Sequence, residues 1–222
     1  LDNLSNTLNV FLGANVACAQ CHDHPLADWT QREFYELAAF FGATDVSDRD
    51  PRKVGNRLGS GQLSKQDVIK AVAPNMARVH TKGAQTLKFP SDYAYDDVKP
   101  GSPVEPLLFV WESGDEKGPA YQVNHKNPRT LRSSFAKWLT HEKNPRFAAT
   151  IANRLWARAF GLGVKEPLDD LDDLSKSANP ALLQLLGQIM VKADFDLREF
   201  QRVLFNSKAY QAKASVSPPI GE

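Results

Sequence analysis

Five consecutive residues hold the side chains of this sequence that are best suited to bind a cofactor: Cys18-Ala19-Gln20-Cys21-His22. The chain has two cysteines, and both lie in this run. A Cys-x-x-Cys-His run is the attachment signature of c-type haem, in which two thiols add to the porphyrin vinyl groups and the histidine ligates the iron. Two intervening residues let both sulfurs reach one side of the macrocycle. The run therefore predicts one covalent haem c held by Cys18, Cys21 and His22.

Other uses of the two thiols stay open at this point. A redox-active Cys-x-x-Cys pair normally begins a helix, whose N-terminus lowers the thiol pKa, whereas here an apolar, helix-like run from residue 8 to 17 precedes the cysteines. A zinc site could use Cys18 and Cys21 with His22 or His24, but such sites usually take a second ligand pair from elsewhere, and none of the other histidines is paired. A structural disulfide, or two buried thiols, is the third alternative.

The ligand at the sixth iron position would decide what the haem does. A second strong ligand gives low-spin iron suited to electron transfer, whereas an open position allows peroxide chemistry. The loop-rich middle of the chain offers Met76, His80 and His125 as distal ligands. A haem peroxidase or oxidase would instead need a distal acid–base group, for which His125 or Asp97 is the candidate. Electron transfer is the preferred hypothesis, with a haem enzyme and a non-haem interaction module as alternatives.

Charged residues near this region suggest two lesser roles. Asp92, Asp96 and Asp97 form an acidic patch whose carboxylates could hold a cation, but the patch lacks the glycine and terminal glutamate of a calcium loop. A solvated loop is therefore the better interpretation. Arg32 could pair with a haem propionate, although an exposed surface arginine is the more common case.

The elements that position the motif are expected to be helical. Apolar residues at helical spacing predict a helix over residues 2–17 that delivers the cysteines at its C-terminal end. A second helix should begin at Thr30, which forms a Thr-x-x-Glu capping box with Glu33, and should end at Gly42. Its apolar stripe could form a wall for a porphyrin or could be ordinary core packing. The stripe comprises Phe34, Leu37, Ala38 and Phe41.

The chain is mainly α in this interpretation and divides into four parts. Residues 1–89 form a helical, haem-bearing part, with a loop over residues 43–63 and a short β-hairpin within residues 79–89. Residues 90–130 are rich in proline and glycine and form a linker or loop region. Residues 131–212 form a C-terminal helical bundle, and residues 213–222 form a tail.

Strong start signals mark the C-terminal helices. Asn144-Pro145 and Asn179-Pro180 each place an N-cap before a proline at the first helical position. A further helix should run from Leu131 to Thr140, and Asp196 should cap the last one. This part contains no convincing catalytic constellation, so it suits docking as readily as chemistry.

Composition excludes several classes of protein. The chain has 222 residues, 42% of them hydrophobic and 24% charged, which is ordinary usage for a globular protein. The formal net charge of +1 gives no global field that would attract nucleic acid. No apolar run is long enough to span a bilayer. Because covalent attachment at Cys-x-x-Cys-His takes place outside the cytoplasm, we expect a periplasmic or otherwise extracytoplasmic protein with an unknown redox partner.

The sequence resembles two protein domains in about two thirds of its length. The N-terminal stretch from Phe11 to Phe41 resembles the planctomycete cytochrome-c-like domain, through Phe11-Leu12-Gly13, Ala17 to Pro25, Trp29-Thr30 and Tyr35-x-x-Ala38-Ala39-Phe40-Phe41. The C-terminal half is similar to its companion, a planctomycete-specific C-terminal domain, through Phe135-Ala136-x-Trp138-Leu139-Thr140, Asn144-Pro145-x-Phe147-Ala148, Asn153-Arg154-Leu155-Trp156, Phe160-Gly161-x-Gly163 and Ser207-x-x-Tyr210-Gln211. The resemblance implies haem at Cys18, Cys21 and His22. It also implies that this chain, which begins at Leu1, is one part of a larger exported protein.

Overall fold

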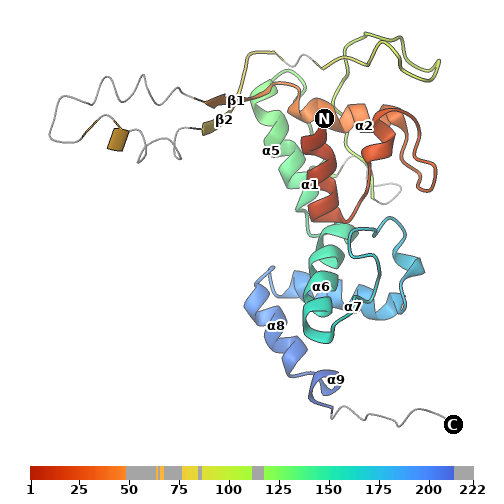
Figure 1. Cartoon of the computed structure of the whole chain (residues 1–222), viewed down its shortest axis with the longest axis vertical. Coiled ribbons are helices and arrows are strands. Elements are labelled where there is room, and N and C mark those ends of the chain that lie inside the picture. The colour runs from red at the N-terminus through yellow and green to blue at the C-terminus, as the bar shows by residue number, and fades with distance from the viewer. Residues whose placement is uncertain (49–63, 65, 68–76, 85–86, 112–117, 213–222) are drawn as a thin grey trace.

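The computed structural model describes residues 1–48, 64, 66–67, 77–84, 87–111 and 118–212. The chain is mainly helical, as predicted, and two strands form a small antiparallel sheet (Figure 1). Among the described residues no helix is long and apolar enough to cross a membrane. The elements are α1 (Asp2–Leu12), η1 (Ala17–Gln20), α2 (Gln31–Ala38), η2 (Ala39–Phe41), β1 (Thr44–Asp48), β2 (Ala77–Thr81), η4 (Pro119–Tyr121), α5 (Pro128–Leu139), α6 (Pro145–Phe160), η5 (Leu174–Lys176), α7 (Pro180–Lys192), α8 (Leu197–Phe205) and α9 (Lys208–Gln211).

Helix α1 ends five residues before the predicted end at residue 17. Gly13 stops it by adopting a left-handed conformation, with φ of 58°, and its N–H bonds back to the Asn9 and Leu8 carbonyls. A Cβ atom at this position would lie 2.6 Å from Leu171 Cδ1, so the glycine also allows another segment to approach closely. The prediction that the cysteines sit at the end of this helix is therefore wrong, because Cys18 lies in the separate turn η1 and Cys21 is the C-cap of that turn.

The capping box predicted for the second helix is confirmed. Thr30 Oγ1 accepts a hydrogen bond from the Glu33 N–H at 3.2 Å, and Glu33 Oε2 accepts one from the Thr30 N–H at 2.8 Å. The apolar stripe of α2 and η2 is packed into a core, and the Phe41 ring lies 4.9 Å from the Phe135 ring of α5. Core packing, rather than a porphyrin wall, is thus the observed role of this stripe.

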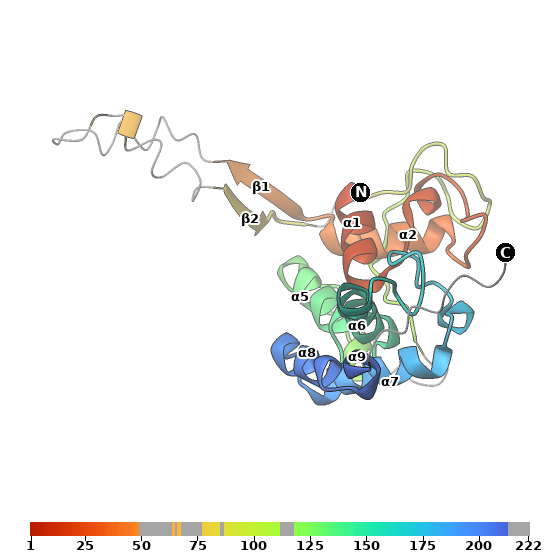
Figure 2. The same ribbon diagram turned by 60° about the horizontal axis from the view of Figure 1, so that its bottom comes forward.

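The two strands pair across a separation that the sequence analysis did not anticipate. β1 pairs with β2 so that Val46 lies opposite Val79 and Asp45 opposite His80. The predicted hairpin within residues 79–89 is therefore wrong. The predicted loop over residues 43–63 is wrong for residues 44–48, which form β1, and residues 49–63 lie outside the described ones. Figures 1 and 2 show the two strands projecting from one side of the helical body.

Two hydrophobic cores organise the helices. The first core joins α1 and α2 to α5, with residues such as Tyr93, Val104 and Leu108 from the proline- and glycine-rich region. The second core joins α6, α7 and α8. The change from one core to the other thus falls between α5 and α6, whereas the sequence analysis divided the chain at residues 90 and 130. Whether the chain folds as separate domains with boundaries at residues 90 and 130 stays a prediction.

The predicted helix starts in the C-terminal region are confirmed. Asn144 Oδ1 accepts hydrogen bonds from the Arg146 and Phe147 N–H groups at 3.1 and 3.3 Å, and Asn179 Oδ1 accepts one from the Leu182 N–H at 3.0 Å. Each asparagine is followed by proline at the first helical position. α5 begins at Pro128, three residues before the predicted Leu131.

The half of the chain around the first core (α1 to α5) packs directly on the half around the second core (α6 to α9). Arg154 of α6 donates hydrogen bonds to the carbonyls of Asn9, at 3.1 Å, and Val10, both in the last turn of α1. The Leu171 N–H donates to the Gly13 carbonyl at 2.7 Å. Because these bonds satisfy the end of α1, the two halves are held in one relative position.

Candidate functional site

The two cysteines lie on the outer side of η1. Val16 and Ala19 are buried in the first core, with 1% and 0% of their surface exposed, whereas Cys18 and Cys21 are exposed. The Cys21 N–H donates to the Cys18 carbonyl at 3.2 Å, which closes the turn. Two inward apolar side chains therefore anchor the turn and leave both thiols free on the surface.

The neighbouring histidine has a tautomer suited to binding a metal. His22 Nδ1 lies 2.7 Å from the Asp23 carbonyl oxygen. A carbonyl can only accept a hydrogen bond, so Nδ1 carries the proton. In the neutral ring Nε2 is then unprotonated, and its lone pair can coordinate a metal. This arrangement, with one ring nitrogen bonded to a carbonyl, is the usual orientation of a metal-ligating histidine.

A network of hydrogen bonds fixes the loop that follows the motif. Asp23 Oδ1 accepts a hydrogen bond from the Gln31 N–H at 2.8 Å, and the Asp23 N–H donates to Tyr95 Oη at 2.8 Å. The Gln20 carbonyl accepts bonds from Gln31 Nε2 and Tyr35 Oη, both at 3.3 Å. The supporting roles of Gln31 and Tyr95 could not be predicted from the sequence, because their hydrogen-bonding capacity carries no pattern along the chain.

The tyrosines beside the motif are held in their protonated form. Burial raises the pKa of Tyr35, and the negative charge of Asp92 acts in the same direction. Burial also raises the pKa of Tyr93, whose hydroxyl donates a hydrogen bond to Asp97 Oδ1 at 3.0 Å. Both phenols therefore act as hydrogen-bond donors at neutral pH.

The structure does not assemble a zinc site or a disulfide at the motif. Cys18 and Cys21 are free thiols, and His24 Nδ1 accepts a hydrogen bond from the Leu26 N–H at 3.1 Å. Within the part of the chain that the structure describes, no three His, Cys, Asp or Glu side chains are close enough together to hold a metal ion. A zinc ligand set is thus not preformed around these cysteines.

Of the three predicted distal ligands, the structure describes His80 and His125. Met76 lies outside the described residues. His80 lies on β2 beside Asp45, with 3.8 Å between Nε2 and Oδ2. Figures 1 and 2 show β2 on one side of α1, and the red-orange loop that follows α1 in the chain on the other side. His125 is exposed in the turn before α5.

Within the acidic patch, Asp97 forms an ion pair with Arg32. Arg32 binds Glu36 at 2.8 Å and Asp97 at 3.5 Å, and these partners raise the pKa of its guanidinium. Arg32, the predicted propionate partner, is thus paired with carboxylates of this chain. Asp97, the predicted acid–base group, is paired with Arg32.

The donor set fits covalent haem attachment at an exposed position of the chain. The two exposed thiols and the free Nε2 of His22 supply what attachment and axial ligation require. Cys18, Cys21 and His22 line none of four cavities found among the described residues. Both cysteines are exposed, so a group attached to them would lie at the surface of the described part of the chain.

Comparison with protein families finds matches at the two ends of the chain. Residues 1–46 match the family model PSCyt2, and residues 131–220 match PSD1; the descriptions are "Protein of unknown function (DUF1549)" and "Protein of unknown function (DUF1553)". No curated protein and no solved structure matches the chain. The chain is thus similar, in the region of the motif and in its C-terminal region, to two planctomycete-type domains of unknown function.

Proposed function

We propose that this chain carries one covalent haem c, attached through Cys18 and Cys21 with His22 as an axial ligand, and that it transfers electrons. The observation that carries the proposal is the geometry of the motif. Two free, exposed thiols lie on one turn anchored by buried neighbours, and the adjacent histidine has an unprotonated Nε2. When bound, haem supplies one-electron exchange between ferrous and ferric iron.

The residues around the motif give it a fixed frame. Gln31 and Tyr35 hold the Gln20 carbonyl, while Asp23 is held by Gln31 and Tyr95. These three side chains, which come from α2 and the 90–97 segment, would hold the backbone on both sides of His22 in place if the histidine ligated haem iron. Small reorganisation at the ligand is what electron transfer requires.

The surface position favours electron transfer over enzymatic peroxide chemistry. A haem peroxidase needs an acid–base group in a distal space that excludes water, but the motif lines none of the cavities described above. Asp97 is occupied by Tyr93 and Arg32, and His125 is exposed. A haem at the surface could instead approach a redox partner directly.

Two further parts of the proposal follow from covalent attachment. Because this chemistry takes place outside the cytoplasm, we place the chain in the periplasm or another extracytoplasmic compartment. We also expect a redox protein as its partner. The near-neutral net charge of +1 offers no general attraction to nucleic acid.

The test is the absorption spectrum of the full chain, exported from a host that attaches c-type haem. We expect a pyridine haemochrome of the c type that survives acid–acetone extraction, and reversible reduction by a one-electron donor without turnover of peroxide. The double variant Cys18→Ala/Cys21→Ala should lose covalent haem, whereas His24→Gln, a matched change beside the motif, should keep it. A colourless wild-type protein would refute the proposal. Rapid peroxide turnover would refute electron transfer as the function and favour the haem enzyme instead.

A further inference from the structure

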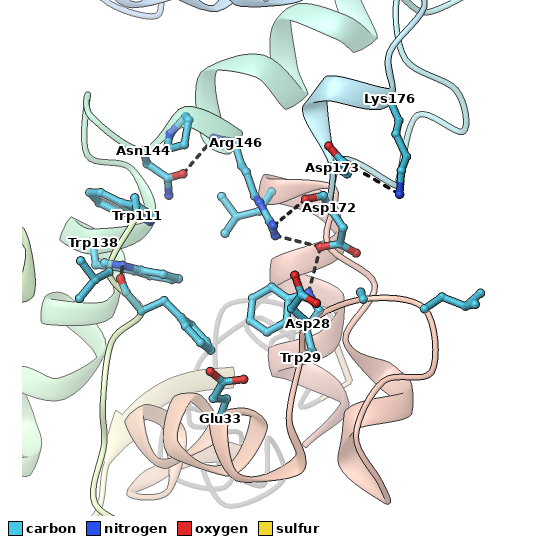
Figure 3. Close-up of a pocket in the computed structure, with 16 residues that line it drawn as sticks. Asp28, Trp29, Glu33, Trp111, Trp138, Asn144, Arg146, Asp172, Asp173 and Lys176 are labelled. Atoms are coloured by element: carbon cyan, nitrogen blue, oxygen red, sulfur yellow. Dashed lines mark hydrogen bonds and ion pairs between the residues drawn. The ribbon is translucent and has the colours of Figure 1, made fainter. Parts of the chain in front are cut away.

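A second site lies where the two halves meet, apart from the cysteine motif. It is a cavity of about 640 Å³ that is lined by residues from both halves, including three of the four tryptophans (Figure 3). This volume falls within the range of about 300–1,000 Å³ that is typical of small-molecule sites. The tryptophans are Trp29, Trp111 and Trp138.

One wall of the cavity is fixed by a network that crosses between the halves. Asp172 Oδ1 accepts hydrogen bonds from Trp29 Nε1 and Arg146 Nη1, both at 2.9 Å. The Arg146 guanidinium also lies over the Trp29 ring, 5.5 Å from its centroid. This wall exists only when Trp29 and the C-terminal residues are in place together.

The opposite wall is aromatic. Trp111 stacks on Trp138 with centroids 5.8 Å apart and an angle of 18° between the rings, and Trp138 Nε1 donates to the Phe109 carbonyl at 2.8 Å. Figure 3 shows these two rings facing the Arg146–Asp172 pair across the cavity. Trp138 is almost fully buried, so Trp111 and Phe109, which are half-buried, present the accessible apolar surface.

The charges on the lining exclude an anion as the preferred ligand. Arg146 is paired with Asp172, and Lys176 lies 3.3 Å from Asp173. In contrast, Asp28 and Glu33 have no cation within ion-pair distance among the residues that the structure describes. The cavity therefore has two carboxylates in excess, which repel anions and accept hydrogen bonds.

The lining also offers hydrogen-bond donors and apolar surface to a ligand. Lys176 Nζ has three N–H donors and is well exposed, so donors remain for a ligand after its contact with Asp173. A quaternary ammonium would suit the carboxylates and the rings but would offer nothing to Lys176. Sugar hydroxyls both donate and accept, and the C–H face of a sugar ring packs on an aromatic ring. We infer that this cavity binds a neutral saccharide.

The test measures binding of neutral sugars to the full chain by calorimetry and by saturation-transfer NMR. The probes are glucose, galactose, mannose, fucose, cellobiose and maltose. We expect at least one to bind. Loss of one hydrogen bond to a charged group in Asp28→Asn should weaken binding about tenfold. Trp111→Ala should weaken it by a similar factor, whereas Trp111→Phe keeps an aromatic surface and should change it less than about threefold.

Control variants separate this cavity from the rest of the protein. Trp156 stacks on Phe160 outside the cavity, at 3.9 Å between centroids, so Trp156→Phe should leave binding unchanged. Asp28 is exposed, and Asp28→Asn keeps its size, so this variant should fold even if Trp111→Ala does not. The inference is overturned if no probe sugar binds, if binding survives both Asp28→Asn and Trp111→Ala unchanged, or if tetramethylammonium binds in place of the sugars. None of these outcomes depends on haem.

Discussion

Replacing Asn153 by alanine should destabilise the C-terminal half by about 3–5 kcal/mol. Asn153 lies on α6 with 0% of its surface exposed, and its side chain satisfies three backbone groups of the following loop. Oδ1 accepts hydrogen bonds from the Val164 and Lys165 N–H groups at 2.7 and 3.1 Å, and Nδ2 donates to the Lys165 carbonyl at 2.7 Å. Alanine would leave two donors and one acceptor without partners.

The magnitude follows from the cost of each orphaned group. An unsatisfied buried polar group costs about 1–3 kcal/mol, so three such groups set an upper range of about 3–9 kcal/mol. Water that enters the space left by the amide would satisfy some of them, which gives the lower part of this range. Since whole domains are stable by about 5–15 kcal/mol, the loss should be a large fraction of the total.

Urea unfolding of the full chain, followed by circular dichroism, measures the effect. Asn3→Ala is the matched control, because Asn3 is an exposed residue of α1, and its change should stay within about 0.5 kcal/mol. Asn153→Asp keeps both accepted bonds but loses the donor and buries a charge, so it should also be strongly destabilising. If Asn153→Ala lowered the free energy of unfolding by less than about 1 kcal/mol, the loop would not depend on this side chain and the reasoning would be refuted.

Three further predictions concern helix ends. Thr30→Ala should cost about 1 kcal/mol in urea unfolding through loss of the capping box, with Thr30→Ser as a control that keeps the cap; equal stability of both variants would contradict this. Gly13→Ala should cost about 2 kcal/mol or more in the same assay, because it combines left-handed backbone strain with a clash against Leu171, whereas Gly101→Ala, with φ of 76° and open space, should cost about 1 kcal/mol; similar costs would exclude the clash. Hydrogen bonds from the Glu199 and Arg198 N–H groups lower the pKa of Asp196, so its contribution to stability is complete above the unfolded pKa of about 3.9 and is lost as the pH falls through the folded pKa. Asp196→Asn should therefore reduce the loss in urea midpoint between about pH 5 and pH 3, and an unchanged loss would show that the cap does not titrate.

Helix ends were the part of the fold that the sequence predicted best. The capping partners of Thr30 and Asn144 lie within three residues of each cap, so their whole signal is contained in a short window. The end of α1 had an equally local signal in Gly13, but the apolar spacing continues to Val16 and masked it. The periodicity continues because Val16 is buried too, although it lies beyond the helix.

Pairings over long separations were not predictable in the same way. β1 pairs with β2 so that Val46 lies opposite Val79, 33 positions later, and the strand pattern around Val79 alone does not specify its partner. At the candidate site the same contrast holds. The Cys-x-x-Cys-His spacing identifies the motif, but the contact of Asp23 with Tyr95 spans 72 positions and depends on the whole first core.

The cavity between the halves extends this argument to function. The family matches cover residues 1–46 and 131–220, and each contributes one side of the Trp29–Asp172 hydrogen bond that fixes a wall. Neither matched region alone forms the lining, and Trp111 comes from the segment between them. Residues that bind only across an interface of this kind show no spacing within either region. A cavity built this way gives a physical reason for the two regions to occur in one chain, because ligand binding would stabilise the docked arrangement of the halves over any separated one.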